Sequence, residues 1–366
     1  MTTPPFSIVI IGLSLSSSWG NGHATTFRSL IGGLHAAGER VLFLERDVPW
    51  YAGNRDLPDP DFCRLDYYDS LDALSGRYGE ALRTAEAVII GSYVPDGVEV
   101  IDMVAGLGPK RLCFYDIDTP VTLGKLDRGE EDYLALRQIP LFDIYFSFSG
   151  GPVLDRLEAG YGARRARPLY CSVDVERYRP SGESPRWDLG YLGTYSPDRQ
   201  PSLEKLLIGP ARLLPQMRFV VAGPQYPDTI DWPANVERID HLPPAEHARF
   251  YSRQRFTLNV TRADMIAAGW SPSVRLFEAA SCRTPIISDW WNGLDQFLPD
   301  GESIVIARDT EDVVAALTRL TPEDRERLAR NAHARVIHDH SGAARARELI
   351  AALTAVMPAR PAAETA

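Results

Sequence analysis

Residues 269–289 read GWSPSVRLFEAASCRTPIISD, a helical pattern that runs directly into an apolar strand. Ser271 is a good N-cap and Pro272 a good first helical residue, so the sequence predicts a helix from here to about Cys282. Glu278 lies among apolar residues of this helix. A buried carboxylate is costly unless a partner satisfies it. Glu278 therefore needs a partner, either from the protein or from a ligand.

The same alternation of strand and helix extends along the chain, which predicts parallel sheets with helices on both faces. Apolar runs of strand length include FSIVIIGLSL, RVLFLER, AVIIGSY, RLCFYDI and DIYFSFS, then WDLGYLGTY, MRFVVAGPQ, NVERIDHL and RFTLNVTR. The segment RPSGESPR, residues 179–186, interrupts the pattern and is the best linker. We expect two Rossmann-like α/β domains, residues 1–180 and 187–340, facing a central cleft. A further helix over 341–357 and a disordered tail over 358–366 complete the prediction.

Composition and charge limit the classes of function. The 366 residues carry a formal net charge of −10, which argues against a surface that coats nucleic acid or an anionic bilayer. No apolar run approaches the ~18 residues of a membrane span, and a basic signal-peptide region is lacking, so we expect peripheral membrane contact at most. The 4 cysteines are far apart, which fits a reducing cytoplasm. We expect a cytoplasmic protein that binds a small molecule.

The loop SSSWGNGHATT, residues 16–26, follows the first predicted strand, and ligands bind at this edge of parallel sheets. Gly20, Asn21 and Gly22 allow close approach of the backbone to an acceptor or a phosphate at the start of the next helix. The loop is not a complete G-x-G-x-x-G, so it does not predict a dinucleotide site. His23 is either a general base or a helix cap.

The loop GYLGTYSPDRQPS, residues 190–202, follows the first strand of the second half. Gly193, Thr194 and Ser196 bring small side chains and backbone donors to the sheet edge. Arg199 adds a planar fork of donors that matches a diphosphate. The alternative is that SPDR forms only a turn and a helix cap.

The helix of the opening stretch offers another anion site at its start, where the N–H groups of Ser271 and Ser273 have no helical partners. Arg275 and Glu278 lie along one side of this helix. The carboxylate can accept hydrogen bonds from both hydroxyls of a ribose. The alternative is an ion pair between Arg275 and Glu278 within the helix, which would contribute little.

Two further pairs need separate interpretation. Asp116 and Asp118 in FYDIDTP have a spacing that can chelate a metal, but this spacing is common by chance. We expect no metal and interpret Asp118 as an acceptor contact or general base. Trp290 and Trp291 follow a predicted buried strand and could stack on a sugar or an acceptor, although packing in the core explains one of them equally well.

Residues 258–307, which contain SVRLFEAASCRTPIISD, resemble the C-terminal half of GT-B glycosyltransferases and are most similar to the CgeB-like family, named for a spore maturation protein. YLGTYSPDRQ and the C-terminal helices also fit this family. The resemblance implies a nucleotide-diphosphate sugar bound by the C-terminal domain, an acceptor bound by the N-terminal domain, transfer without a metal or other cofactor, and a last helix that returns to the N-terminal domain. It also implies that Glu278 binds the nucleotide ribose, and that Arg199, Arg262 and the N–H groups of 271–273 bind the diphosphate.

The chain departs from this family at two positions. Trp270 stands where many retaining GT-B enzymes have the first glutamate of a pair, which leaves the stereochemistry open, and Arg283 stands where glycine is common. We expect a hexosyltransferase-like enzyme whose acceptor is a glycan, a lipid-linked group, a protein or a small molecule. If transfer inverts the anomeric configuration of the sugar, His23 or Asp118 must deprotonate the acceptor hydroxyl. The alternatives are a nucleotide-sugar epimerase and a catalytically degenerate binding protein of the same fold.

Overall fold

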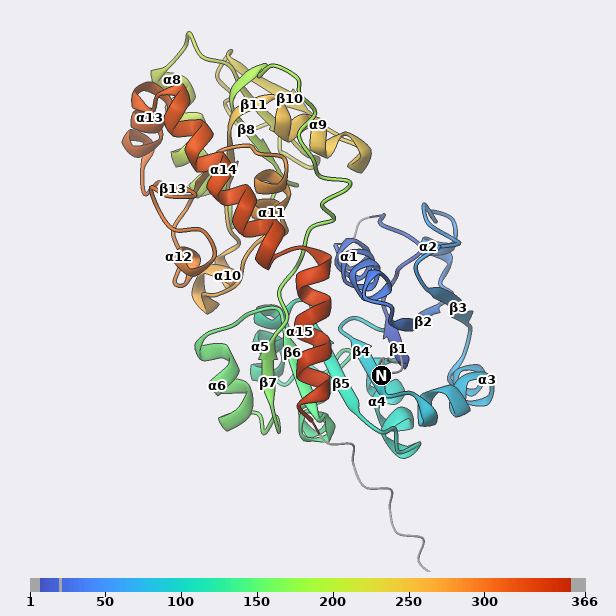
Figure 1. The fold of residues 1–366 in the computed structure, drawn as a ribbon. Helices are drawn as coiled ribbons and strands as arrows, with labels where there is room; N and C mark the ends of the chain where they lie inside the picture. The colour runs from blue at the N-terminus through green and yellow to red at the C-terminus, as the bar shows by residue number, and fades with distance from the viewer. Residues whose placement is uncertain (1–6, 20–21, 357–366) are drawn as a thin grey trace, which may run out of the picture. The chain divides into compact units, whose positions relative to one another are not determined.

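The computed structural model describes residues 7–19 and 22–356, which form two compact units. Unit 1 contains the residues up to Ser172 together with those from Gly342 onward, and unit 2 is Val173–Ser341. The expected linker at 179–186 therefore follows the point where the chain enters unit 2. The expected tail at 358–366 lies outside the described residues. Each unit is an α/β structure built on one parallel sheet (Figure 1).

Unit 1 has a 7-stranded sheet in the order β3-β2-β1-β4-β5-β6-β7, and every neighbouring pair is parallel. Its strands are β1 Ser7–Gly12, β2 Arg40–Arg46, β3 Arg64–Tyr68, β4 Ala87–Gly91, β5 Leu112–Asp116, β6 Ile144–Ser147 and β7 Ala166–Pro168. The central strands are continuously apolar and buried, as expected where helices cover both faces. The sequence analysis missed β3, an edge strand that reads RLDYY.

The helices of unit 1 are α1 His23–Ala36, α2 Pro49–Ala52, α3 Leu71–Thr84, α4 Gly97–Gly106, α5 Thr119–Asp127, α6 Pro152–Ala159 and α15 Gly342–Thr354. Helix α1 is followed by Gly38, which adopts φ +85° and whose N–H donates to the carbonyl of His35 at 2.9 Å. The C-terminal helix α15 belongs to unit 1.

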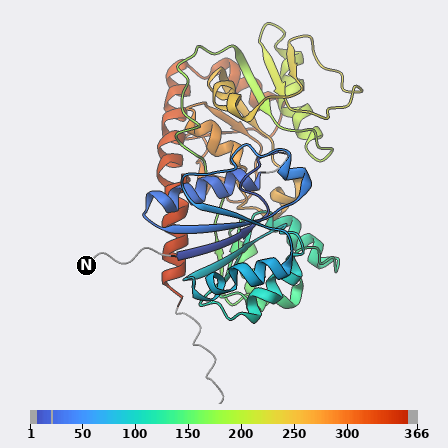
Figure 2. The ribbon, with the colours of Figure 1, turned by 90° about the vertical axis from the view of Figure 1, so that its right-hand side faces the viewer.

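Helix α15 packs against α1, and the two helices cross where they lie next to each other in Figure 2. The contact is close because both helices present glycine. A Cβ added at Gly33 would lie 2.1 Å from the carbonyl oxygen of Gly342, and a Cβ added at Gly342 would lie 2.1 Å from that of Ser29. Leu349 and Leu353 of α15 join the core of unit 1. This helix therefore completes the core of the unit in which the chain begins.

Unit 2 has a 6-stranded parallel sheet in the order β10-β9-β8-β11-β12-β13. Its strands are β8 Trp187–Leu192, β9 Phe219–Ala222, β10 Val236–Ile239, β11 Gln254–Asn259, β12 Ile286–Ser288 and β13 Val305–Ile306. Its helices are α7 Gln200–Leu203, α8 Gly209–Leu213, α9 His247–Ser252, α10 Ala263–Ala268, α11 Val274–Ser281, α12 Leu294–Phe297, α13 Thr310–Arg319 and α14 Pro322–Asp339.

Helix α11 is the helix of the opening stretch, and it begins later than predicted. Its N-cap is Ser273, whose hydroxyl accepts the N–H of Arg275, whereas Ser271 is fully buried before the helix starts. The prediction of Ser271 as N-cap is wrong because the backbone at Gly269 and Trp270 adopts positive φ and delays the first helical turn.

Candidate functional site

The loops after β8, β9, β11 and β12 meet at one edge of the sheet, here called the carboxyl edge of unit 2. Two hydrogen bonds tie the β8 loop to β9 and its loop. Gly193 N–H donates to Ala222 O, at the end of β9, at 2.9 Å, and the Tyr226 side-chain OH donates to Gly193 O at 3.1 Å. Gly223 has φ +143°, and a Cβ there would lie 2.1 Å from Gly193 O. Only glycine fits this position, so the β8 loop is held tightly against the β9 loop.

Arg275 reaches from α11 across this edge. Its Nε donates to Leu192 O at 2.6 Å and its Nη1 to Asn259 Oδ1 at 3.0 Å, so the side chain ties α11 to the ends of β8 and β11. Among the described residues, no acidic side chain forms an ion pair with Arg275. The alternative of an ion pair between Arg275 and Glu278 within the helix is therefore not found. Because its partners are neutral, the charge of this half-buried guanidinium is available to an anion.

The Glu278 carboxylate is buried against tyrosine hydroxyls. Tyr251 of α9 donates to its Oε2 at 2.9 Å, and only 7% of Glu278 is exposed. Burial raises the pKa of the Tyr251 and Tyr178 hydroxyls well above the ordinary value for tyrosine, and the negative charge of Glu278 raises it further. Tyr178 OH also lies 3.4 Å from His247 Nδ1. The protein thus supplies a first partner for Glu278, one that the sequence analysis missed because FYS at 250–252 reads only as core helix.

The carboxylate of Asp198 interacts electrostatically with two of the predicted arginines, Arg199 and Arg262. It accepts the hydroxyl of Ser196 and, at 3.0 Å, the first N–H of α10. Burial acts to raise the pKa of Asp198, but these hydrogen bonds and the charges of Arg199 and Arg262 outweigh it and lower that pKa. Arg199 also donates to Thr194 O at 2.7 Å. The predicted residues of the β8 loop and Arg262 therefore form one cluster.

A second buried carboxylate, Asp289, fixes the loops after β11 and β12. It accepts the N–H and the hydroxyl of Thr261, both at 2.7 Å, and burial raises its pKa. Asn259 donates to Ser288 Oγ at 2.9 Å in the same cluster. This network holds the chain rigidly where Trp290 leaves the sheet.

In unit 1, the loop after β1 is organised by Glu45, a fully buried residue near the end of β2. Glu45 accepts the N–H groups of Leu15 at 2.7 Å and Ser16 at 2.9 Å, and the Ser16 hydroxyl at 2.6 Å. A phosphate at these N–H groups would meet a buried negative charge, so an anion is not favoured there. Of the predicted loop residues, Gly22 is the exposed N-cap of α1, while Gly20 and Asn21 lie outside the described residues.

Tyr93 contacts both candidate bases of unit 1. The ring of His23, the first residue of α1, meets the Tyr93 ring edge-on at 5.3 Å, and burial lowers the pKa of His23 to about 4. Tyr93 OH donates to Asp118 Oδ2 at 3.1 Å. Tyr93 itself has φ +62°, an unusual backbone for tyrosine. The topology therefore brings His23 and Asp118 to one place after β1, β4 and β5.

Asp116 is a buried structural residue. Tyr145 OH donates to it at 2.6 Å and Thr122 OH at 2.7 Å, and burial raises its pKa to about 6. Among the described residues, no group of three or more acidic, histidine or cysteine side chains is placed to hold a metal.

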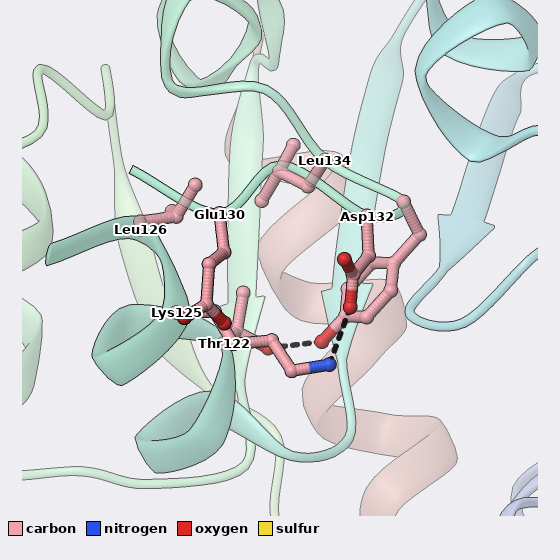
Figure 3. A pocket seen from close by; sticks show the side chains of 7 residues that line it. Thr122, Lys125, Leu126, Glu130, Asp132 and Leu134 are labelled. Atoms are coloured by element: carbon pink, nitrogen blue, oxygen red, sulfur yellow. Dashed lines mark hydrogen bonds and ion pairs between the residues drawn. The ribbon is translucent and has the colours of Figure 1, made fainter. Parts of the chain in front are cut away.

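A small pocket beside Asp116 is lined by α5 and the segment that follows it (Figure 3). Its polar side chains pair with one another, because Thr122 bonds to Tyr133 OH at 2.6 Å and Lys125 to Asp132 at 2.5 Å. These polar groups already have hydrogen-bond partners within the protein, so the pocket offers few of them to a ligand.

The comparisons with known proteins agree with this architecture. Residues 199–351 match a family model described as Glycosyl transferase-like. A search of curated proteins found no match. Similar solved structures include sucrose-phosphate synthase of Thermosynechococcus elongatus (15% identity, 96% of this chain and 99% of that chain, TM-score 0.63). HepE of Anabaena in complex with UDP (12%, 96% and 100%, 0.68) and a glycosyltransferase of Rickettsia africae (9%, 96% and 99%, 0.67) are also similar.

The chain has the two-domain Rossmann-like fold of GT-B glycosyltransferases, as the sequence predicted. The finer likeness to CgeB-like proteins stays a prediction. None of the helices in the described part of the chain has the length and apolar character that a bilayer span needs.

Proposed function

We propose that this protein is a glycosyltransferase that uses a nucleotide-diphosphate sugar and binds it at the carboxyl edge of unit 2. The observation that carries the proposal is the placement of Arg275, Arg199 and Arg262 at that edge, each without an ion pair among the described residues, beside the buried carboxylate of Glu278. The match of residues 199–351 to the glycosyl transferase-like model covers all four side chains.

The proposed chemistry is stabilisation of a leaving group. When the bond between the anomeric carbon and the diphosphate oxygen breaks, negative charge grows on the diphosphate. Arg199 and Arg262 meet that charge with fixed donors, and Arg275 adds a half-buried cation that needs no reorganisation. Glu278 accepts hydrogen bonds from the ribose hydroxyls. A carboxylate can do this while it also accepts the hydrogen bond from Tyr251, because its two oxygens have further lone pairs. The arginines supply the charge, so the proposal requires no metal.

Uracil is the first base to test. HepE of Anabaena has been solved in complex with UDP-glucose and with UDP and glucose. An α-glucosyltransferase of the same fold has been solved with UDP and a 13-mer DNA. These ligands belong to those proteins, and they make UDP and UDP-glucose the best first probes for this chain.

The acceptor is proposed to react at unit 1. In an inverting transfer its hydroxyl proton passes to His23 or Asp118 as the new bond to the anomeric carbon forms. Burial lowers the pKa of His23 to about 4, so the imidazole is neutral at neutral pH but is a weaker base than an exposed histidine. Tyr93, which touches both side chains, positions them.

The test is a thermal-shift panel of UDP, GDP, TDP, ADP and CDP, each alone and as common sugar conjugates. A ligand that binds only the folded state at 100 times its Kd stabilises that state by about 2.7 kcal/mol. We expect one nucleotide to raise the Tm of the wild type and to lose most of that shift in Glu278→Gln, a variant that can still accept the bond from Tyr251. Glu326→Ala, on the exposed face of α14, is the control and should keep the shift.

Arg199→Ala separates the diphosphate from the nucleoside. This variant should lose affinity for the nucleoside diphosphate and keep its weak affinity for the nucleoside. The absence of a shift with every nucleotide, or a full shift in Glu278→Gln, would refute the proposed donor site.

A further inference from the structure

Trp270 has a backbone conformation that large side chains rarely adopt. Its φ is +41°, and Gly269 before it has φ +65°. Positive φ in a bulky residue is strained and persists only where the surroundings enforce it, often at functional sites. The strain lies at the carboxyl edge of unit 2, between α10 and α11.

The loop after β12 enforces this conformation. Trp270 N–H donates to Asn292 O at 2.7 Å, and its indole Nε1 donates to Gln296 Oε1 at 2.9 Å. Gly293 has φ +91°, and a Cβ there would lie 2.6 Å from atoms of the Trp270 ring. The indole therefore lies directly over the backbone of Gly293, with its polar edge satisfied.

Trp290 adds a second indole at the same edge. It is 51% exposed, although the adjacent Trp291 is fully buried in the core. Its base is rigid, because Asp289 is fixed by Thr261. A tryptophan that is half exposed on a rigid loop contributes little to folding, since most of its apolar surface stays in water. Its exposed surface is available to a ligand.

We propose that Trp270 and Trp290 form an aromatic subsite that stacks on the pyranose ring of the donor sugar. The inference rests on the proposed function, because Trp270 precedes α11, which carries Arg275, and Trp290 follows β12 at the same carboxyl edge. An indole face favours the contiguous C–H face of a neutral pyranose, and the exposed amide of Asn292 offers hydrogen bonds to its hydroxyls. The substrate class is thus a nucleotide sugar with an uncharged hexose, recognised through its ring face.

The test compares nucleotides with their sugar conjugates by calorimetry. The matched pairs are UDP and UDP-glucose, GDP and GDP-mannose, and TDP and TDP-rhamnose. For the pair that binds, Trp290→Ala should raise the Kd of the sugar conjugate about 3- to 10-fold, which is the range for one aromatic contact. The Kd of the bare nucleoside diphosphate should stay unchanged. Trp270→Phe should act in the same direction while keeping a ring over Gly293.

The control is Trp50→Ala, because Trp50 is 54% exposed but belongs to unit 1. This variant should leave both Kd values unchanged. Equal weakening of the conjugate and the diphosphate in Trp290→Ala, or no change in either, would overturn the aromatic subsite and leave the proposed transferase intact. Failure of every pair to bind the wild type would overturn both.

Discussion

Replacing Gly33 with alanine should destabilise unit 1, although alanine is the better helix former. In α1, alanine in place of glycine is worth up to ~1 kcal/mol in helix propensity. Against this, the new Cβ would lie 2.1 Å from Gly342 O and 2.3 Å from Gly342 C, whereas ordinary contact begins near 3.4 Å. The clashing atoms are backbone, so no side chain can rotate away.

Helix α15 must therefore withdraw from α1 by roughly an ångström. Gaps of this size forfeit a quarter to a half of each dispersion contact, and overpacking in cores costs about 1–3 kcal/mol. Leu349 and Leu353, which pack in the core, would loosen together. We expect a net loss of about 1–2 kcal/mol for Gly33→Ala after the gain in propensity.

The neighbouring glycine is a matched control. A Cβ at Gly32 meets nothing within 4 Å, so Gly32→Ala should be neutral or stabilise by up to ~1 kcal/mol. The two variants should differ by about 1–3 kcal/mol in urea unfolding, and hydrogen exchange of peptides covering 23–36 should localise the loss to α1. Equal stability of the two variants would refute the close helix contact.

Glu45→Ala should lower the free energy of unfolding by about 2–4 kcal/mol, because it leaves the buried donors of Leu15 and Ser16 without an acceptor; a urea midpoint equal to that of the wild type would contradict this. Burial raises the pKa of Asp116 to about 6, so the folded protein favours the protonated carboxyl more than the unfolded chain does. The stability that this preference contributes is complete below pH ~4 and is lost as the pH rises through 6. Asp116→Asn should therefore gain on the wild type by up to about 3 kcal/mol between pH 4 and pH 7 in urea titrations, and a difference independent of pH would refute the shift. Ser273→Ala should cost about 1 kcal/mol through the lost N-cap of α11, whereas Ser273→Asp should retain most of it; a Tm for the alanine variant equal to the wild type would argue against the assigned cap.

The sheets could be predicted from the sequence because each buried parallel strand is a short apolar run. AVIIG in β4 and LCFYD in β5 are fully buried, so nothing in their pattern competes with a strand. The strand β3 was missed because RLDYY carries charge and pairs only with β2, so it does not need a continuous apolar run. Ligands bind where parallel strands end, and this rule pointed to the loops that carry Arg199 and Arg262 and to the start of α11, which carries Arg275, without any knowledge of their partners.

The partners themselves depend on contacts far apart in the chain. Spacing suggested that Arg275 would pair with Glu278, but Arg275 bonds to the ends of two strands and Glu278 to Tyr251. Ser271 and Ser273 are both suitable caps by residue type, but Ser273 is the one that caps α11. Local patterns do not encode such choices, since tertiary contacts override them.

The return of α15 to unit 1 has a consequence during synthesis. A ribosome finishes β7 and then makes all of unit 2 before the helix that completes the first core emerges, and at ~5–20 residues per second this delay lasts roughly 10 to 30 s. Through that interval the face of α1 that carries Ser29 and Gly33 lacks its cover. The second domain in the sequence is therefore the first that can mature, and the nascent first domain needs shelter from aggregation until the last helix arrives.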